Sequence, residues 1–411
     1  MKKIIISLGI IGVVAAAVIV GTIAYFNDTE TSTGNIMIAG TMDLKVDHTR
    51  QTYNDIDCKT CSVEIKSDTT NTVISTNGGD DPVLFPHAAK QVSSPYPAWT
   101  VTADIPEATW IWATDPTTAH DSGNVNVYYT FQKTFEWWGP ISGATLSLGV
   151  GTDNGYEVKL NGTIVGTDWS EKNYLSPADT YSSFGGLIVQ GTNTLEIQVK
   201  NQALPGGTPS TNPAGLLYKL TINGNCGSDY FKTHCKLWGL KDLGENDTFW
   251  NFDDIKPGDR GTNVISLHAY DNDAFACLIT HKIVNQDNGI VDPEQAAGDI
   301  GEPGELSQFI KLFAWEDDGD GVYEGETILI GPNAAFDTRV GRISLAESNT
   351  KYIGLAWCAG TQGLTGNTIT CDGSTMGDIA QTDILTASIT AYAEQQRNNP
   401  NFSCATVQLP N

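Results

Sequence analysis

The stretch from Tyr156 to Gly166 reads Y-E-V-K-L-N-G-T-I-V-G and decides the fold class. Two short alternating runs flank Asn161-Gly162, the residue pair that supplies both positive φ angles of a type I′ turn. The pattern therefore predicts a β-hairpin. Similar alternating runs occur at 125–132, 195–199 and 216–222, without intervening helical patterns. We therefore expect an all-β sandwich or jelly roll.

The first 25 residues have the pattern of an export signal. Lys2 and Lys3 precede an apolar run that ends at Tyr25, and a polar segment follows it. This order is typical of a signal peptide. We expect a signal peptidase to cut at Tyr25 or Phe26 and release an extracellular or cell-surface protein. The alternative is an uncleaved membrane anchor, because about 20 apolar residues can span a bilayer.

Length and composition point to two folded domains. A chain of 411 residues exceeds the usual size of one domain, and 40% hydrophobic residues are enough to build cores. The formal net charge of −25 argues against a nucleic-acid partner, because phosphates are bound by Lys and Arg.

The strand pattern is lost after the first strand and returns near Trp99. In between, Thr, Ser, Asn, Asp and Gly dominate, which is typical of a loop or linker. An inserted domain is tolerated where the two ends of the host lie close together. The predicted organisation is a signal peptide at 1–25, a host β-sandwich at 26–56 and 227–404, a linker at 57–94, an inserted jelly roll at 95–226 and a tail at 405–411.

All eight cysteines lie beyond the predicted signal, and an even number in an exported chain predicts disulfides. The alternative is a zinc site, because Cys58-x-x-Cys61 has ligand spacing, although no second such pair accompanies it. The spacing leaves the pairing open. The disulfide candidates are Cys58, Cys61, Cys226, Cys235, Cys277, Cys358, Cys371 and Cys404.

The run E-D-D-G-D-G-V-Y-E-G-E at 316–326 is the clearest candidate metal site. Oxygen ligands at alternate positions around a glycine are typical of the first half of a calcium loop. The run departs from an EF-hand, because Thr327 occupies the twelfth place and no helices flank it. The alternative is a solvated acidic turn. The predicted Ca²⁺ ligands are Glu316, Asp318, Asp320, the carbonyl of Val322, Glu324 and Glu326, with Asp317 as a further candidate.

Aromatic residues cluster in the predicted inserted domain, and exposed Trp or Tyr rings can stack on sugars. The alternative is a purely structural role in the core. Adjacent side chains in a strand point to opposite faces, so one of Trp137 and Trp138 is expected to reach the surface. The candidate glycan-binding residues are Trp137, Trp138, Trp169 and Tyr156.

The chain lacks the sequence signatures of common hydrolases. No H-E-x-x-H zinc motif and no G-x-S-x-G nucleophile motif occurs, and no cysteine has the pattern of an activated nucleophile. The sequence therefore predicts that the chain is not an enzyme.

Three segments resemble TasA/camelysin family proteins. They are A-Y-F-N-D at 24–28 followed by A-G-T-M-D-L at 39–44, F-W-N-F-D-D-I-K-P-G-D at 249–259, and G-E-L-S-Q-F at 304–309. The resemblance implies removal of the signal by a SipW-type peptidase. It also implies self-association into extracellular fibres, although camelysin-type relatives have been labelled metallopeptidases. The runs V-Y-Y-T-F-Q-K-T-F, A-T-L-S-L-G-V-G-T-D-N-G-Y-E-V-K-L-N-G-T and N-T-L-E-I-Q-V-K-N resemble a galactose-binding-type jelly roll across 95–225.

These observations predict an exported structural subunit of extracellular fibres or of a biofilm matrix, stabilised by calcium. Assembly would use the mature N-terminus, Phe26 to Ala39, as a strand added to the sheet edge of a neighbouring subunit. The alternative is a surface adhesin or carbohydrate-binding protein that acts through the inserted jelly roll. A metallopeptidase is the third and weakest interpretation.

Overall fold

The computed structural model describes residues 42–78, 83–114, 125–207, 211–244 and 247–409, together with two short paired strands, β1 (Thr31–Ser32) and β2 (Asn35–Ile36). Strands make up 48% and helices 9% of the structure, and the three α-helices of the described ranges are short. The predicted all-β sandwich fold is therefore confirmed. The predicted cleavage site at Tyr25 and Phe26 lies outside the described residues.

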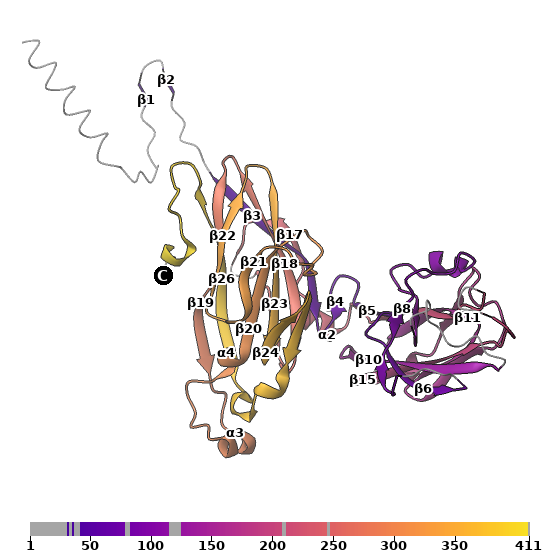
Figure 1. Ribbon diagram of the computed structural model, residues 1–411. Coiled ribbons are helices and arrows are strands. Elements are labelled where there is room, and N and C mark those ends of the chain that lie inside the picture. Colours follow the sequence, from indigo (N-terminus) through magenta and orange to yellow (C-terminus); the bar gives the residue numbers. More distant parts are fainter. Residues whose placement is uncertain are drawn as a thin grey trace, which may run out of the picture.

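The host domain consists of two antiparallel layers (Figure 1). The larger layer has the order β17-β3-β18-β23-β20-β21 and the smaller has the order β22-β19-β26. The strands of the larger layer are β17 (Trp238–Lys241), β3 (Asp43–Tyr53), β18 (Arg260–Tyr270), β23 (Thr350–Ala359), β20 (Ile310–Asp317) and β21 (Ile328–Ala335). Those of the smaller layer are β22 (Arg339–Leu345), β19 (Ala274–Gln286) and β26 (Ile384–Gln395).

The host core fills the space between these layers, because alternate residues of each strand point inward. Leu267, Leu312 and Leu355 contribute from the larger layer, and Leu278 and Ile343 contribute from the smaller. A hairpin of β24 (Thr361–Thr365) and β25 (Thr368–Asp372) covers the outer side of β20. The helices α3 (Asp292–Ala297) and α4 (Leu306–Phe309) lie in the connection between β19 and β20.

The inserted domain is a second two-layer sandwich, to the right in Figure 1. One layer has the order β13-β12-β15-β10-β6-β7, and the other has the order β14-β11-β16-β5, with β9 beside β16 and β8 beside β9. The first layer comprises β13 (Thr163–Asp168), β12 (Gly155–Leu160), β15 (Gly191–Asn201), β10 (Val127–Trp137), β6 (Thr72–Asn77) and β7 (His87–Ala88). The second comprises β14 (Asp179–Ser182), β11 (Thr145–Asp153), β16 (Gly215–Asn223), β5 (Ser62–Lys66), β8 (Lys90–Gln91) and β9 (Ile111–Trp112).

The hairpin predicted around Asn161-Gly162 is confirmed. It joins β12 to β13, and φ is 49° at Asn161 and 78° at Gly162. Asn161 also accepts a hydrogen bond from the Thr194 amide at 2.8 Å, which ties the turn to β15. The turn chemistry and the strand register are therefore mutually consistent.

The prediction of a linker at 57–94 is wrong. Strand β5 pairs with β16 and strand β6 pairs with β10, so this segment supplies part of both layers of the inserted sandwich. Its Ser and Thr residues suggested a loop, but Thr is β-branched and suits a strand with one solvated face. Ile65 and Val73 point the other way and are buried in the core. The inserted domain therefore begins near residue 62 rather than near residue 95.

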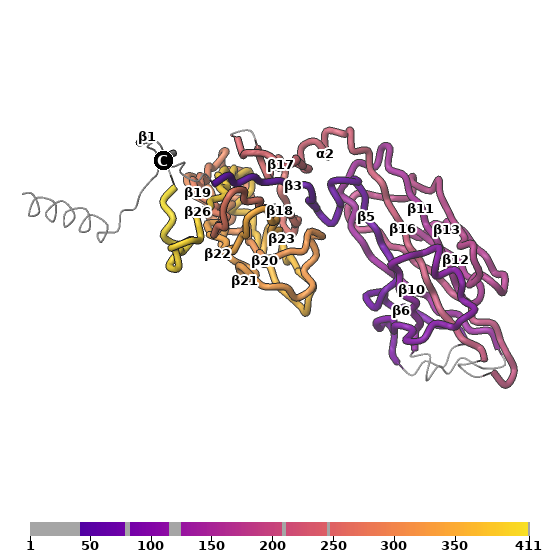
Figure 2. The backbone as a smooth tube through the Cα atoms, turned by 90° about the horizontal axis from the view of Figure 1, so that it is seen from above, coloured from indigo at the N-terminus to yellow at the C-terminus, as the bar shows by residue number. Residues whose placement is uncertain are grey.

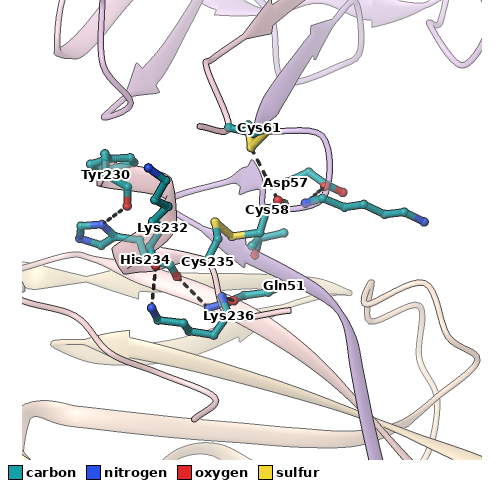
Figure 3. Close-up of a disulfide and its surroundings, with 12 residues drawn as sticks. Gln51, Asp57, Cys58, Cys61, Tyr230, Lys232, His234, Cys235 and Lys236 are labelled. Atoms are coloured by element: carbon teal, nitrogen blue, oxygen red, sulfur yellow. Dashed lines mark hydrogen bonds between the residues drawn. A yellow bond between two sulfur atoms is a disulfide. The ribbon is translucent and has the colours of Figure 1, made fainter. Parts of the chain in front are cut away.

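Two segments of the chain run between the host domain and the inserted domain (Figure 2). The strand β4 (Ile56–Asp57) pairs with both β3 and β5, so one hydrogen-bonded ladder continues from the host into the inserted domain. The returning segment carries α2 (Asp229–His234), whose last carbonyl accepts a hydrogen bond from Gln51 Nε2 at 3.1 Å. The disulfide Cys58–Cys235 links the outgoing and returning segments (Figure 3). A second disulfide, Cys61–Cys226, links them as well.

All eight cysteines form disulfides, as predicted, and the structure supplies the pairing. The other two bonds are Cys277–Cys404 and Cys358–Cys371. Cys58 and Cys61 are therefore not free to bind zinc together. Four disulfides indicate an oxidising compartment. Within the described ranges, no helix has the length and apolar character needed to cross a membrane.

The predicted tail at 405–411 is packed against the host domain in the part that the structure describes. Val407 is buried with Phe402 against the outer face of β19. The Arg339 guanidinium donates hydrogen bonds to the carbonyls of Cys404 and Val407, at 2.8 and 2.9 Å. The C-terminal segment thus packs on the host domain.

Candidate functional site

The predicted metal loop follows β20 and is folded around Asp317. Asp317 is buried, and its carboxylate accepts hydrogen bonds from Trp315 Nε1 at 2.9 Å and from the amides of Gly319 and Gly321. Burial raises the pKa of Asp317, and these donors oppose that shift. At Gly321 φ is 76°, which favours glycine. Asp317 therefore shapes the loop.

Asp318 and Asp320 are exposed, and one oxygen of each lies within 4.8 Å of the other and of an Asp317 oxygen. Oxygen ligands of this kind suit Ca²⁺. Arg50 donates to the carbonyls of Gly319 and Asp320, which places one cation beside the loop.

The other predicted carboxylate ligands do not join this cluster. Glu316 forms an ion pair with Lys351 at 3.3 Å, and Glu326 accepts a hydrogen bond from the Glu324 amide at 2.6 Å. The acidic loop thus brings together Asp318 and Asp320, with Asp317 where sequence spacing suggested Glu316.

We expect Tb³⁺, a luminescent substitute for Ca²⁺, to bind at Asp318 and Asp320 and to be excited through the nearby Trp315. Excess calcium should quench the emission by displacing the ion. The variant Asp318→Ala/Asp320→Ala should lose most of this emission, whereas Glu347→Ala at an exposed turn should keep it. Equal emission from both variants would identify the loop as a solvated acidic turn.

The second candidate site lies at the end of the inserted sandwich where β11 ends and β12 begins. Asp153, the last residue of β11, is buried, and Trp99 Nε1 donates a 2.8 Å hydrogen bond to its Oδ2. Trp99 in turn packs against Trp110, with ring centroids 4.1 Å apart. Burial raises the pKa of Asp153 to about 7, and the Trp99 hydrogen bond opposes this shift. Asp153 therefore changes charge near neutral pH.

Trp169 projects from the same end because the chain around it is held on both sides. The Asp168 carboxylate accepts a hydrogen bond from the Ser170 amide at 2.7 Å, and the Asp168 carbonyl accepts one from Asn173 Nδ2 at 3.0 Å. A Cβ atom on Gly155 would lie 2.8 Å from the Cα of Trp169, so glycine is needed for this close approach. Trp169 contacts Tyr128 edge-to-face and leaves 41% of its surface exposed.

Polar groups and a second exposed ring surround these residues. Tyr96 is 43% exposed, and Tyr174 lies close enough to Asp153 and Glu171 for their charges to raise its pKa, after burial as the main cause. The backbone amide of Gln202 donates a 2.8 Å hydrogen bond to Asn154 Oδ1. We call the set Tyr96, Asp153, Asn154, Trp169, Glu171, Tyr174 and Gln202 the aromatic end of the inserted domain.

Two of the four predicted glycan-binding residues are corrected. Trp137 and Tyr156 are fully buried in the core, so neither ring can stack on a sugar. They alternate with outward-facing neighbours and point inward. Trp138 is partly exposed at the opposite end, beside Gly191, whereas Trp169 is exposed at the aromatic end.

The glycan-binding residues predicted from the sequence did not include Asp153, Tyr96 or Tyr174. A signal for Asp153 was present, because it is an acidic residue at the end of a strand followed by Asn154-Gly155, a turn pair. The partner Trp99 is 54 residues away, and no local pattern predicts that contact.

A shallow hollow of about 450 Å³ lies at the opposite end of the same sandwich. Its lining includes Ile141, Leu146, Ser182 and Gly185, with no aromatic or titratable side chain among the residues that line it. The aromatic end therefore offers more chemistry for recognising a ligand.

No protein-family model matches the chain, and no curated protein matches it. Among solved structures, a putative β-galactosidase from Bacteroides fragilis shares 11% identity with a TM-score of 0.24, covering 81% of this chain and 43% of that one. A β-glucuronidase from Bifidobacterium dentium, complexed with coumarin-3-O-glucuronide, shares 10% identity with a TM-score of 0.26, covering 81% of this chain and 48% of that one. A β-D-mannosidase from Dictyoglomus thermophilum shares 10% identity with a TM-score of 0.25, covering 73% of this chain and 32% of that one. The chain thus spans less than half the length of these structures.

The prediction that the chain is not an enzyme is corrected by this comparison, because the solved structures named above are all glycosidases. At TM-scores of 0.24 to 0.26 the likeness assigns no glycosidase activity or substrate to this chain. The comparisons do not test the TasA/camelysin resemblance.

Proposed function

We propose that this chain is an exported surface protein that binds carbohydrate through the aromatic end of its inserted sandwich. The observation that carries the proposal is that the exposed Trp169 ring projects at the end of the sandwich where the buried Asp153 carboxylate lies, because the backbone of Trp169 packs against Gly155. A flat apolar ring next to a few fixed polar groups is the usual composition of a small-ligand site.

Each part of the aromatic end has a role in this proposal. Trp169 and Tyr96 would stack on the apolar faces of sugar rings. Asp153 Oδ2 is already held by Trp99, which orients the carboxylate and leaves Oδ1 for a ligand hydroxyl. Hydrogen bonds among Asn154, Glu171 and Gln202 hold the adjoining loops in place, so little ordering is needed when a ligand binds.

Glycan-array binding by the mature protein tests this proposal. Trp169→Ala should weaken binding to any glycan recognised by the wild-type protein by roughly 5- to 150-fold, on the scale of the roughly 1–3 kcal/mol that a nucleic-acid base stacked on an aromatic side chain contributes. Trp138→Ala is the matched control, since Trp138 is also partly exposed but lies about 30 Å away along β10. Loss of binding in the Trp138 variant instead would place the site at the opposite end of the sandwich, and no binding by the wild-type protein would contradict the proposal.

A fibre subunit is the second candidate, favoured by the edge of the smaller host layer. Within the described residues, the 12-residue strand β26 pairs with β19 on one side only. A long edge with unpaired backbone groups can accept a strand from another subunit. We propose that self-association of this kind requires signal removal, and that the TasA/camelysin resemblance reflects it.

Electron microscopy of the mature protein tests this second candidate. Deletion of residues 26–38 should abolish fibres and leave the melting temperature unchanged. A protein that forms no fibres before the deletion would exclude the candidate. Loss of the fold after the deletion would mean that the segment belongs to its own domain.

A further inference from the structure

Five carboxylates lie together beside α3 and α4, four from the connection between β19 and β20 and one, Asp383, from the segment just before β26. We call this set the α3–α4 carboxylate cluster, and it consists of Asp287, Glu294, Asp299, Glu305 and Asp383. None of the ion pairs between described residues includes any of the five. The cluster therefore carries negative charge without a cationic side chain to balance it.

Asp299 and Asp383 share one arrangement, in which the backbone holds one oxygen and leaves the other without a partner. Asp383 Oδ2 accepts hydrogen bonds from the amides of Glu305 and Leu306, the latter at 3.0 Å, whereas Oδ1 is buried and unpartnered. Asp299 Oδ1 accepts the Gly301 amide at 2.9 Å, whereas Oδ2 is buried and unpartnered. Asp299 is only 8% exposed. Buried carboxylate oxygens without a partner are costly, so a missing ligand is implied.

Glu305 adds a third buried, unpartnered oxygen, Oε2. The pKa of Glu305 is raised mainly by burial. The charges of neighbouring carboxylates raise it further, and these belong to Asp299, Asp383, Asp287 and Glu294. Burial likewise raises the pKa of Asp383, with Glu294 and Asp287 contributing. The backbone contacts show which of these residues are neighbours: the Glu305 amide binds Asp383, and Gly301, whose amide binds Asp299, would carry a Cβ atom 3.3 Å from Asp287 Oδ2.

Gly304 keeps part of that space open. A Cβ atom on this buried glycine would lie 2.6 Å from Asp383 Oδ1 and 2.8 Å from the carbonyl oxygen of Gln286. Any side chain there would fill the place where these two oxygens meet. A carbonyl oxygen and carboxylate oxygens together form a ligand set that suits a hard cation such as Ca²⁺ better than it suits softer metals.

We infer that the α3–α4 carboxylate cluster is a divalent-cation site for Ca²⁺, with Asp299, Glu305, Asp383 and the Gln286 carbonyl as ligands. Within the described residues, only Asp317, Asp318 and Asp320 bring three such oxygens within 4.8 Å of one another. The cluster must therefore contract around the ion, which would join the β19–β20 connection to the segment just before β26.

The test uses the full mature chain carrying Asp318→Ala/Asp320→Ala, so that the exposed loop no longer contributes. Calorimetric titration with CaCl₂ should give one site in this background and none after Asp299→Asn or Asp383→Asn is added. Millimolar calcium should raise the melting temperature of the Asp318→Ala/Asp320→Ala chain, here called the background, and should not raise it after Asp299→Asn or Asp383→Asn is added. Asp292→Asn, an exposed acid on α3, is the matched control and should keep the site.

Melting in EGTA separates a cation site from a structural role of these side chains. Asparagine keeps the oxygen that accepts the backbone hydrogen bond and removes the charge. The Asn variants should therefore melt at or above the background temperature without calcium, and below it with calcium. The inference is overturned if calcium gives neither heat nor stabilisation in the background. It is equally overturned if acidification stabilises the background while calcium has no effect at any pH, because the carboxylates would then be sharing protons.

Discussion

A fragment of residues 59–227 is expected to fold cooperatively, whereas a fragment of residues 95–226 is expected to remain unfolded. The longer fragment contains β5 and β6, which pair with β16 and β10, and it contains both cysteines of the Cys61–Cys226 disulfide. The shorter fragment lacks the buried side chains of Ile65, Val73 and Val92. Each would contribute roughly 1.5–3 kcal/mol when buried, and a whole domain is stable by only about 5–15 kcal/mol.

Polar groups increase the effect of this truncation. The buried Tyr218 hydroxyl donates to Asn71 Oδ1 at 2.5 Å, and its carbonyl accepts the Ser67 amide at 3.0 Å. Removing residues before 95 leaves both Tyr218 groups without these partners, which adds a desolvation cost. Thermal melts and amide dispersion in NMR spectra would distinguish the fragments. A folded 95–226 fragment would show that β5 and β6 are dispensable, and Cys61→Ser/Cys226→Ser in the longer fragment controls for the disulfide.

The second large effect expected is a pH-dependent stabilisation by Asp153→Asn. The pKa of Asp153 is raised to about 7 in the folded protein from 3.8, mainly by burial. Above pH 7 the folded protein must keep this buried charge, whereas protonation between about pH 7 and pH 4 stabilises it relative to the unfolded chain. The cost at high pH is at most roughly 4 kcal/mol, from the size of the shift.

Asparagine removes this charge and can still accept the Trp99 hydrogen bond. Asp153→Asn should therefore raise the melting temperature near pH 8, and the gain should disappear near pH 4. Asp229→Asn, whose side chain is fully exposed, should change little at either pH. A destabilised variant near pH 8 would mean that the Asp153 anion is stabilised, and a gain that is independent of pH would mean that it does not come from removing the charge.

Local sequence patterns predicted the elements whose conformation depends on neighbouring residues in the chain. Asn161-Gly162 predicted its hairpin, because the turn needs two positive φ angles. Alternating apolar residues predicted β10 and β15, because one face of each strand is buried. The strands β5 and β6 were missed, because their polar faces are solvated and their partners β16 and β10 are distant in the sequence.

The candidate sites depend on contacts that sequence spacing cannot give. Spacing predicted Asp318 and Asp320 as ligands, and the structure brings these two carboxylates together with Asp317, whereas the side chain of Glu316 turns toward Lys351. Trp169 was identified by residue type alone, whereas Asp153 acquires its properties from Trp99, which is contributed by a distant segment. Asp299 and Asp383 are 84 residues apart and were not distinguished from the many other acids of this chain.

The most direct test of carbohydrate binding at the aromatic end follows the indole N–H signals of the tryptophans during titration with an array-selected glycan. Trp169 lies in the proposed site, Trp99 reports on Asp153 through its hydrogen bond, and Trp138 lies at the opposite end. We expect saturable shifts of the Trp169 and Trp99 signals while the Trp138 signal stays unchanged. Shifts confined to Trp138, or no shift of Trp169 at saturation, would contradict a carbohydrate site at the aromatic end.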